Sequence, residues 1–378
     1  MSDDFTLVQS EAEYTRVLAA LEGRGRFAID TEFVRERTFF PVLALVQIAW
    51  EGGLALLDPF ELDMQRLRPL FESKALAVTH ACSQDLPILE AAIGVRPSRL
   101  FDTQIAGAFL GHGVPSLGAI VERTLGVKLA KGDQLADWTR RPLDPRTRRY
   151  AASDVLHLLE LHDALGRELE QRGRLAWAEE ECEIALQKAS VRPLDEAWWR
   201  LKGKAKLRGS ARGVAQALAR FRLEEAAERN VPVKRVLSDM AILAMANRPP
   251  KKPRDLERIR GMHAPKANFA RRVIAAVERG LSLEGDGLCL PPKRKGGDEQ
   301  RAAATLCGAW LAQLSAAHGI DMATLATRDD IEHWLRGSPS RLDSGWRHEL
   351  THEAMGALKE GKAALRLDEG ELSLVMLG

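Results

Sequence analysis

Short apolar runs alternate with turn residues near the start of the chain. The runs "RFAID", "LALVQIAW", "LALLD" and "ALAVTHA" are separated by Gly, Pro or charged residues. Short apolar runs with such boundaries are typical of β-strands. The pattern therefore predicts four strands between residues 26 and 81.

The spacing of apolar residues becomes helical after these strands. "SQDLPILEAAIG", "DTQIAGAFLG" and "SLGAIVERTLG" have apolar residues three and four positions apart, and each ends on Gly. This pattern predicts helices that stop at their glycines. The stretch from Pro142 to Ser190 is helical in pattern as well. Residues 1–170 are therefore predicted to form a mixed α/β domain, and residues 171–204 a helical connector.

From Trp198 onward the pattern predicts amphipathic helices and no strand. The tract "PPKRKGGDEQ", Pro291 to Gln300, combines Pro, Gly and charge as linkers do. We predict two all-α bundles, residues 205–287 and 298–378, joined by a linker at 288–297. Their similar length and order of helices suggest a diverged repeat.

Composition places the chain among soluble globular proteins. Of its 378 residues, 45% are apolar and 29% are charged, which is enough apolar material for several cores. The four cysteines form no CxxC pair, so reduced thiols are expected. The sequence contains no apolar run of membrane-spanning length, and "MSDDFTLVQS" lacks the features of a signal peptide. A cytoplasmic protein without membrane contact is predicted.

Charge is distributed unevenly along the chain. Residues 200–280 hold 21 Lys and Arg against 7 Asp and Glu, a balance of +14. The balances of residues 1–199 and 281–378 are −8 and −4. A basic segment between acidic ones indicates a surface that binds a polyanion, although a solvated Arg-rich helical surface gives the same count.

Two carboxylates, Asp30 and Glu32, follow the apolar start of "FAIDTEF". Residues two apart on a strand project from the same face, so these anions repel each other. Such a pair is stable when it is exposed to water or when a cation offsets the repulsion. By itself the pair does not distinguish surface charges from a metal site.

Three further residues favour the metal site. Asp85 in "SQDLPIL" follows a predicted strand and begins a predicted helix, and "YAASDVLHLLEL" places Tyr150 and Asp154 one helical turn apart. Four carboxylates and a phenol from three segments suit two divalent cations that prefer oxygen ligands, such as Mg²⁺ or Mn²⁺. Taken singly, each residue has a structural explanation. Asp85 suits the start of a helix, Asp154 a charged surface, and Tyr150 a half-buried core position.

These segments resemble the three exonuclease motifs of the DEDD superfamily, in the subclass with a YxxxD third motif. "DTEFVRERTFFP", "LFDTQIA", "KGDQLADWTRRPL" and "YAASDV" are similar to the ribonuclease D family in the same order. The resemblance covers about residues 5–170. Residues near 205–285 and 298–375 resemble the helical nucleic-acid-binding domain (HRDC) shared by RecQ-type helicases and ribonuclease D.

The resemblance implies an RNase H-like fold and a 3′→5′ exoribonuclease. In this family the positions of Asp30, Glu32, Asp85 and Asp154 hold two divalent metals, and that of Tyr150 orients the attacking water. Nucleoside 5′-monophosphates would be released from RNA 3′ ends, with tRNA precursors and other structured RNAs as substrates. A monomer is expected.

Several other residues are predicted to contact the substrate. Phe33 is placed to stack on the terminal base, although it also suits a core position, and His80 and Gln84 flank the second motif. Lys251, Lys252 and Arg254 belong to the basic segment and are predicted to contact phosphates.

Two alternatives remain open from the sequence. The chain could be a DNA 3′→5′ exonuclease of the proofreading or repair type, because the same set of carboxylates serves the hydrolysis of either backbone. A non-catalytic RNA-binding protein would retain the fold alone, but all five catalytic positions are intact here.

Overall fold

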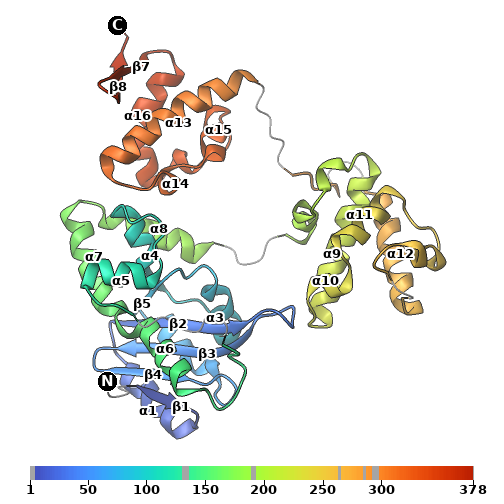
Figure 1. Ribbon diagram of the computed structural model, residues 1–378, viewed down its shortest axis with the longest axis horizontal. Coiled ribbons are helices and arrows are strands. Elements are labelled where there is room, and N and C mark those ends of the chain that lie inside the picture. The colour runs from blue at the N-terminus through green and yellow to red at the C-terminus, as the bar shows by residue number, and fades with distance from the viewer. Residues whose placement is uncertain are drawn as a thin grey trace. The chain divides into compact units, whose positions relative to one another are not determined.

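The computed structural model describes residues 5–129, 136–188, 193–262, 265–283, 287–291 and 298–377 (Figure 1). It divides the chain into two compact units. The first comprises residues 1–32, 43–188 and 295–378, and the second comprises residues 33–42 and 189–294. The predicted linker at 288–297 lies mostly outside the described residues, which omit 292–297.

A mixed sheet forms the centre of the first unit. Its order is β1-β4-β3-β2-β5-β6, with β3 antiparallel to β4 and the β1–β4, β2–β5 and β5–β6 pairs parallel. The strands are β1 (Thr6–Val8), β2 (Arg26–Val34), β3 (Val42–Trp50), β4 (Gly53–Leu57), β5 (Leu76–Thr79) and β6 (Arg99–Asp102). The four predicted strands are confirmed. β1 and β6, with three and four residues, are additional to the prediction.

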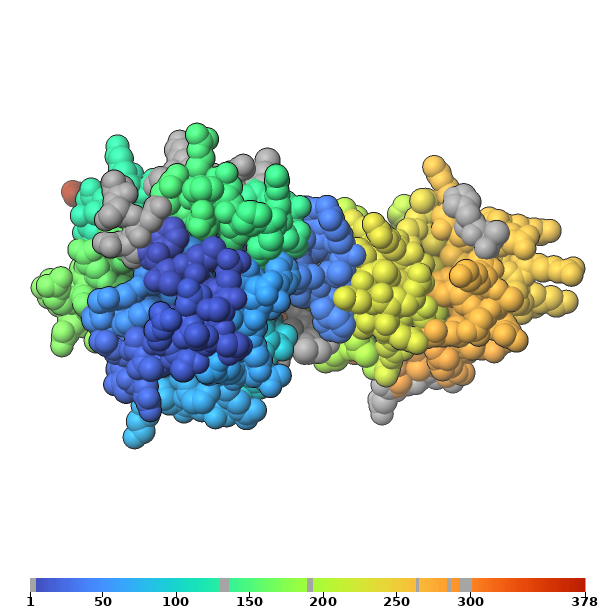
Figure 2. Space-filling view, turned by 90° about the horizontal axis from the view of Figure 1, so that it is seen from below, coloured from blue at the N-terminus to red at the C-terminus, as the bar shows by residue number. Residues whose placement is uncertain are grey.

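Helices cover the sheet. α1 (Glu11–Leu21), α2 (Arg68–Glu72) and α3 (Asp85–Ile93) share one apolar core with the strands, and its buried aromatic members are Tyr14, Phe27 and Phe71. The remaining helices are α4 (Thr103–Phe109), α5 (Leu117–Leu125), α6 (Pro145–Leu156), α7 (Leu158–Gln171) and α8 (Leu175–Gln187). α6 packs against β4 and α7 against β5. The green α6 segment and the dark-blue N-terminal segment share one face of this unit (Figure 2).

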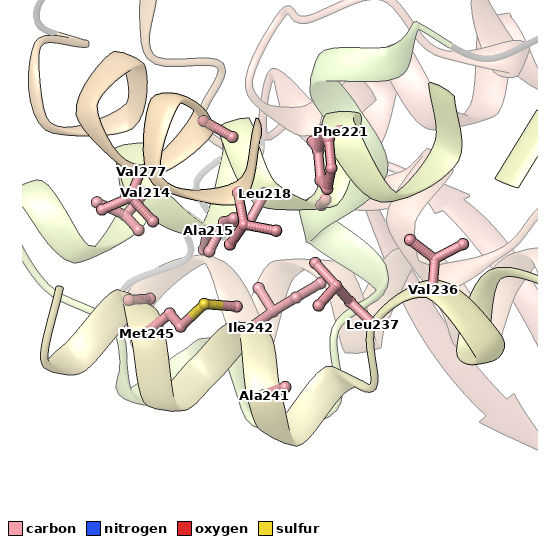
Figure 3. Packing of buried hydrophobic residues seen from close by; sticks show 14 of the residues in the cluster. Val214, Ala215, Leu218, Phe221, Val236, Leu237, Ala241, Ile242, Met245 and Val277 are labelled. Atoms are coloured by element: carbon pink, nitrogen blue, oxygen red, sulfur yellow. The ribbon is translucent and has the colours of Figure 1, made fainter. Parts of the chain in front are cut away.

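The second unit is helical around its own apolar core. Its helices are α9 (Ser210–Glu228), α10 (Val233–Val236), α11 (Asp239–Asn247) and α12 (Ala267–Leu281). Figure 3 shows Val214 and Leu218 of α9 beside Ile242 and Met245 of α11.

The helices α9 and α12 touch through their backbones at two glycines. A Cβ atom at Gly280 would lie 2.4 Å from the Cα atom of Val214, and one at Gly213 would lie 2.3 Å from the carbonyl oxygen of Gly280. Such distances leave no room for a side chain, so glycine at both positions permits this close approach.

The C-terminal region contains helices and one hairpin. The helices are α13 (Asp298–His318), α14 (Met322–Leu325), α15 (Arg328–Leu335) and α16 (Gly345–Lys359). The prediction of no strand after Trp198 is wrong, because β7 (Ala363–Asp368) pairs antiparallel with β8 (Glu371–Met376). The hairpin turns at Glu369 and Gly370, with φ of +49° and +94°. Positive φ at both turn residues matches the right-handed twist of the strands. A short alternation of apolar and polar residues around Glu369 and Gly370 is the sequence signal for this hairpin.

α16 packs against the rest of the first unit through aromatic side chains. Trp346 stacks on Trp177 of α8 with ring centroids 5.3 Å apart, and Phe109 meets Trp346 edge-on at 4.9 Å. The guanidinium of Arg347 pairs with Glu181 of α8. The C-terminal helices therefore belong to the same compact unit as the sheet.

Candidate active site

Three carboxylates meet beside the second half of β2. Asp30 and Glu32 belong to this strand, and Asp154 comes from α6. One ligand oxygen from each residue lies within 4.8 Å of the others, and all three residues are partly buried. Asp30 and Glu32 project from one face of β2, and Asp154 of α6 joins them. These three predicted residues therefore form one acidic cluster.

Asp85 stands beside this cluster. It is the first residue of α3, as predicted, and its carboxylate accepts a hydrogen bond from the hydroxyl of Thr31. The charge of Asp85 raises the pKa of both Asp30 and Glu32. The hydrogen bond from Thr31 therefore connects the start of α3 to β2, the strand that carries Asp30 and Glu32. This role of Thr31 was not predicted, although the residue lies between the two acids in "DTE".

Tyr150 faces the same carboxylates from α6. Burial, followed by the charges of Asp154, Glu32 and Asp30, raises the pKa of its phenol above the ordinary value of 10. The indole of Trp138, which is only 6% exposed, packs near this phenol with ring centroids 6.3 Å apart. The phenol is therefore protonated at neutral pH and is supported from one side.

The acidic cluster is electrostatically strained without a cation. Burial first, then the neighbouring carboxylates, raises the pKa of Asp30 well above its usual range and that of Glu32 to about 8. Burial raises the pKa of Asp154 to about 7. Each shift reports the cost of holding negative charge in this place. A set of carboxylate oxygens fits hard divalent cations such as Mg²⁺ and Mn²⁺, which would offset that cost.

A buried ion pair anchors the loop that leads into α6. Asp58, at the end of β4, is fully buried and accepts hydrogen bonds from Nε and Nη2 of Arg141 at 2.6 and 2.7 Å. Arg141 also donates to the carbonyl oxygens of Trp138 and Ala44. The loop carrying Trp138 is thereby fixed to β3 and β4, next to the helix of Tyr150. This pair was not predicted, because its two residues are 83 positions apart in the chain.

We expect Mg²⁺ to raise the melting temperature strongly at pH 8.5 and weakly at pH 5.5. A carboxyl whose folded-state pKa is raised binds protons in the folded state that the unfolded state has released. For Glu32 this lowers the stability of the metal-free protein from about pH 4.5 up to about pH 8. Cations relieve the repulsion only where the cluster is ionised. Thermal unfolding with Mg²⁺ or chelator at both pH values measures the effect, and equal shifts at the two pH values would contradict it.

The other predicted contact residues occupy separate positions around these elements. Phe33 lies next to Glu32 in β2 and is partly buried, with the guanidinium carbon of Arg35 4.7 Å from its ring centre. Nδ1 of His80 lies 2.9 Å from the hydroxyl of Thr103, and burial lowers the pKa of this imidazole. Gln84 is exposed and immediately precedes α3. Their contacts with substrate stay predictions.

The predicted phosphate-binding residues lie in the second unit. Lys251, Lys252 and Arg254 are exposed, and the backbone N–H groups of both lysines donate to the carboxylate of Asp255 at 2.9 Å. These bonds fix the start of the short helical turn Pro253–Arg258. The three cationic side chains therefore project from a defined turn.

Known protein families match both parts of the chain. A family model described as 3′-5′ exonuclease matches residues 5–170, and one described as HRDC domain matches residues 211–277. Ribonuclease D of Bartonella henselae is 32% identical over 383 residues, covering 98% of this chain and 94% of that protein. Ribonuclease D of Nitrobacter hamburgensis is 33% identical, covering 97% and 98%.

Solved structures agree with these matches. The crystal structure of Escherichia coli RNase D, described as an exoribonuclease involved in structured RNA processing, superposes with a TM-score of 0.84 at 30% identity. The superposition covers 94% of this chain and 99% of that one. The catalytic core of RRP6 from Trypanosoma brucei, at 22% identity and a TM-score of 0.59, shares the fold. The chain therefore belongs to the ribonuclease D family and is a 3′→5′ exoribonuclease that uses divalent cations and binds nucleic acid.

Proposed function

We propose that this exoribonuclease trims the 3′ ends of structured RNAs such as tRNA precursors and releases nucleoside 5′-monophosphates. The observation that carries the site assignment is the convergence of Asp30, Glu32 and Asp154, with Asp85 and Tyr150 beside them. The processing of structured RNA by the E. coli relative supports the substrate class.

Asp30, Glu32, Asp85 and Asp154 would hold two divalent cations, Mg²⁺ or Mn²⁺. When bound, the cations supply Lewis-acid stabilisation of the negative charge that develops on the attacking and leaving oxygens. The carboxylates offer only oxygen donors, which are the preferred ligands of both ions. Their mutual repulsion in the metal-free protein supports this assignment, because it is the cost that the cations remove.

Tyr150 positions the attacking water by hydrogen bonding. Its raised pKa keeps the phenol protonated, so the group donates its proton in a hydrogen bond and does not act as a base. Trp138 and the Asp58–Arg141 pair limit the movement of the phenol and of the loop before its helix. Phe33, His80 and Gln84 are proposed to contact the terminal nucleotide or the phosphate.

The distinguishing experiment compares RNA with a 3′-hydroxyl, RNA with a 3′-phosphate and matched DNA. Each is incubated with Mg²⁺, Mn²⁺ or chelator, and products are resolved by length and identified by mass. Stepwise loss of 5′-monophosphates from 3′-hydroxyl RNA, abolished by chelator, is the expected result. Faster hydrolysis of the DNA strand would favour the proofreading type of 3′→5′ exonuclease and contradict the RNA assignment.

We expect Lys251, Lys252 and Arg254 to strengthen RNA binding through phosphates. Substituting all three by Gln should weaken binding and reduce the slope of log affinity against log salt by about two, because each single-strand phosphate contact contributes about 0.7. Fluorescence anisotropy from low to high salt measures the slope. The control triple substitution to Gln replaces the exposed Arg16, Arg24 and Arg68. An unchanged slope in the first variant would remove these residues from the RNA surface.

We further propose the division predicted from the sequence: a nuclease domain at 1–170, a connector at 171–204, and helical domains at 205–287 and 298–378. We also propose that the chain acts as a monomer in the cytoplasm. Among the described residues, no helix is both long and apolar enough to cross a membrane.

A further inference from the structure

Two histidines on α16 form a pair that the nuclease reaction does not use. His348 and His352 are four residues apart in the segment "HELTH", and both are exposed. Their imidazole rings lie nearly parallel, at 11°, with centroids 4.4 Å apart. Residues at this spacing share one face of a helix, as the two histidines of HExxH zinc sites do.

A backbone hydrogen bond sets the protonation of one ring. Nδ1 of His352 lies 2.9 Å from the carbonyl oxygen of His348. A carbonyl oxygen only accepts, so Nδ1 carries the proton and Nε2 of the neutral ring keeps its lone pair. Metal-binding histidines are commonly oriented by such a bond from the second ring nitrogen. The pair thus has one imidazole already arranged for coordination.

The charges around the pair favour a cation. Glu349 and Glu353, each one residue beyond a histidine, are exposed and add two negative charges to the same two turns of α16. The adjacent Arg347 is buried and pairs with Glu181. Negative potential at a surface raises the local concentration of cations.

We propose that His348 and His352 bind a divalent transition metal of the kind that prefers imidazole, such as Zn²⁺ or Ni²⁺. This site is separate from the acidic cluster, whose oxygen donors prefer Mg²⁺ or Mn²⁺. The pattern HExxH also occurs in zinc hydrolases, where a third protein ligand completes the site. Within the described ranges, Asp30, Glu32 and Asp154 form the only group of three or more His, Cys, Asp or Glu side chains that are close enough to share an ion. The histidine pair is therefore assigned to metal binding and not to hydrolysis, with water in the remaining positions.

Calorimetric titration of the full chain with Zn²⁺ tests the proposal. The protein carries Asp30→Asn and Asp154→Asn, which weaken metal binding at the acidic cluster. We expect one Zn²⁺ per chain, and no competition from Mg²⁺ at the same concentration. Adding His348→Gln and His352→Gln should weaken this binding by at least about tenfold, since even the loss of a supporting partner weakens metal sites about 10–100-fold.

The matched control is His333→Gln, a histidine of α15 in the same C-terminal region. It should leave Zn²⁺ affinity unchanged. Circular dichroism checks the fold, which the exposed α16 positions should preserve. Zn²⁺ affinity that is unaffected by losing both histidines would overturn the proposal. Equal weakening by His333→Gln would do the same, and neither result depends on nuclease activity.

Discussion

Replacing Asp154 by Asn should lower the rate of 3′-nucleotide release by about a thousandfold or more. Bound metal supplies several kcal/mol of charge stabilisation in reactions of this kind, and about 1.4 kcal/mol corresponds to a tenfold change in rate. Asn retains the size of Asp but loses the negative charge and one oxygen donor. Single-turnover digestion of a short 3′-hydroxyl RNA measures the loss.

The same substitution should make the metal-free protein harder to unfold. Asp154 carries its charge in a partly buried place and raises the pKa of Asp30 and Glu32. Removing that charge should raise the free energy of unfolding by about 1–2 kcal/mol at pH 8, and the gain should vanish at low pH, where the group is protonated.

Urea unfolding in chelator at pH 8 and pH 4 separates the two effects. Glu170→Gln, at an exposed position of α7, is the matched loss of one carboxylate and should change neither rate nor stability. Asp154→Asn with unchanged activity would remove this residue from the site. Lost activity together with lost stability would instead indicate that Asp154 supports the fold.

Breaking the Asp58–Arg141 pair should cost about 3–5 kcal/mol of the free energy of unfolding, because it leaves a buried charge without its partner. In Arg141→Met the fully buried carboxylate of Asp58 would keep, from the described residues, its bonds from Gln9 and from the backbone N–H of Phe60. The loop carrying Trp138 would lose its anchor as well. A lower kcat with little change in KM is therefore expected.

Urea unfolding at pH 7 measures the cost. The pair lowers the pKa of Asp58, so its contribution is present near neutral pH and declines as the pH falls through the acid range. Arg140→Met is the control, since Arg140 is the exposed neighbour of Arg141. A loss below about 1 kcal/mol would place the pair among weak surface contacts.

The sequence predicted the features that depend on local spacing. The strand that carries Asp30 and Glu32 and the helix that carries Tyr150 and Asp154 have clear periodicity, so side chains on one face could be assigned from the chain alone. That Asp30, Glu32 and Asp154 meet, with Asp85 beside them, was supported by the resemblance to a family, because convergence of distant segments leaves no local signal.

The features that were missed are a pair of residues far apart in the chain and a hairpin that follows a long helical region. Asp58 and Arg141 are 83 residues apart, and no spacing rule connects them. The hairpin β7–β8 did have a signal, a short alternation around Glu369 and Gly370. Both strands follow four helices, and the prediction extended that helical pattern over residues 363–376.

The backbone contact between α9 and α12 has a consequence for how the second unit presents charge. Arg212 and Arg279 are the immediate neighbours of Gly213 and Gly280, where the helices touch. The separation of these two arginines along the helix surface is therefore set by direct contact between the two main chains at the glycines. A nucleic-acid backbone that contacts both guanidinium groups would therefore meet two cations at a fixed separation. A methyl group added at either glycine would push the helices apart and change that separation.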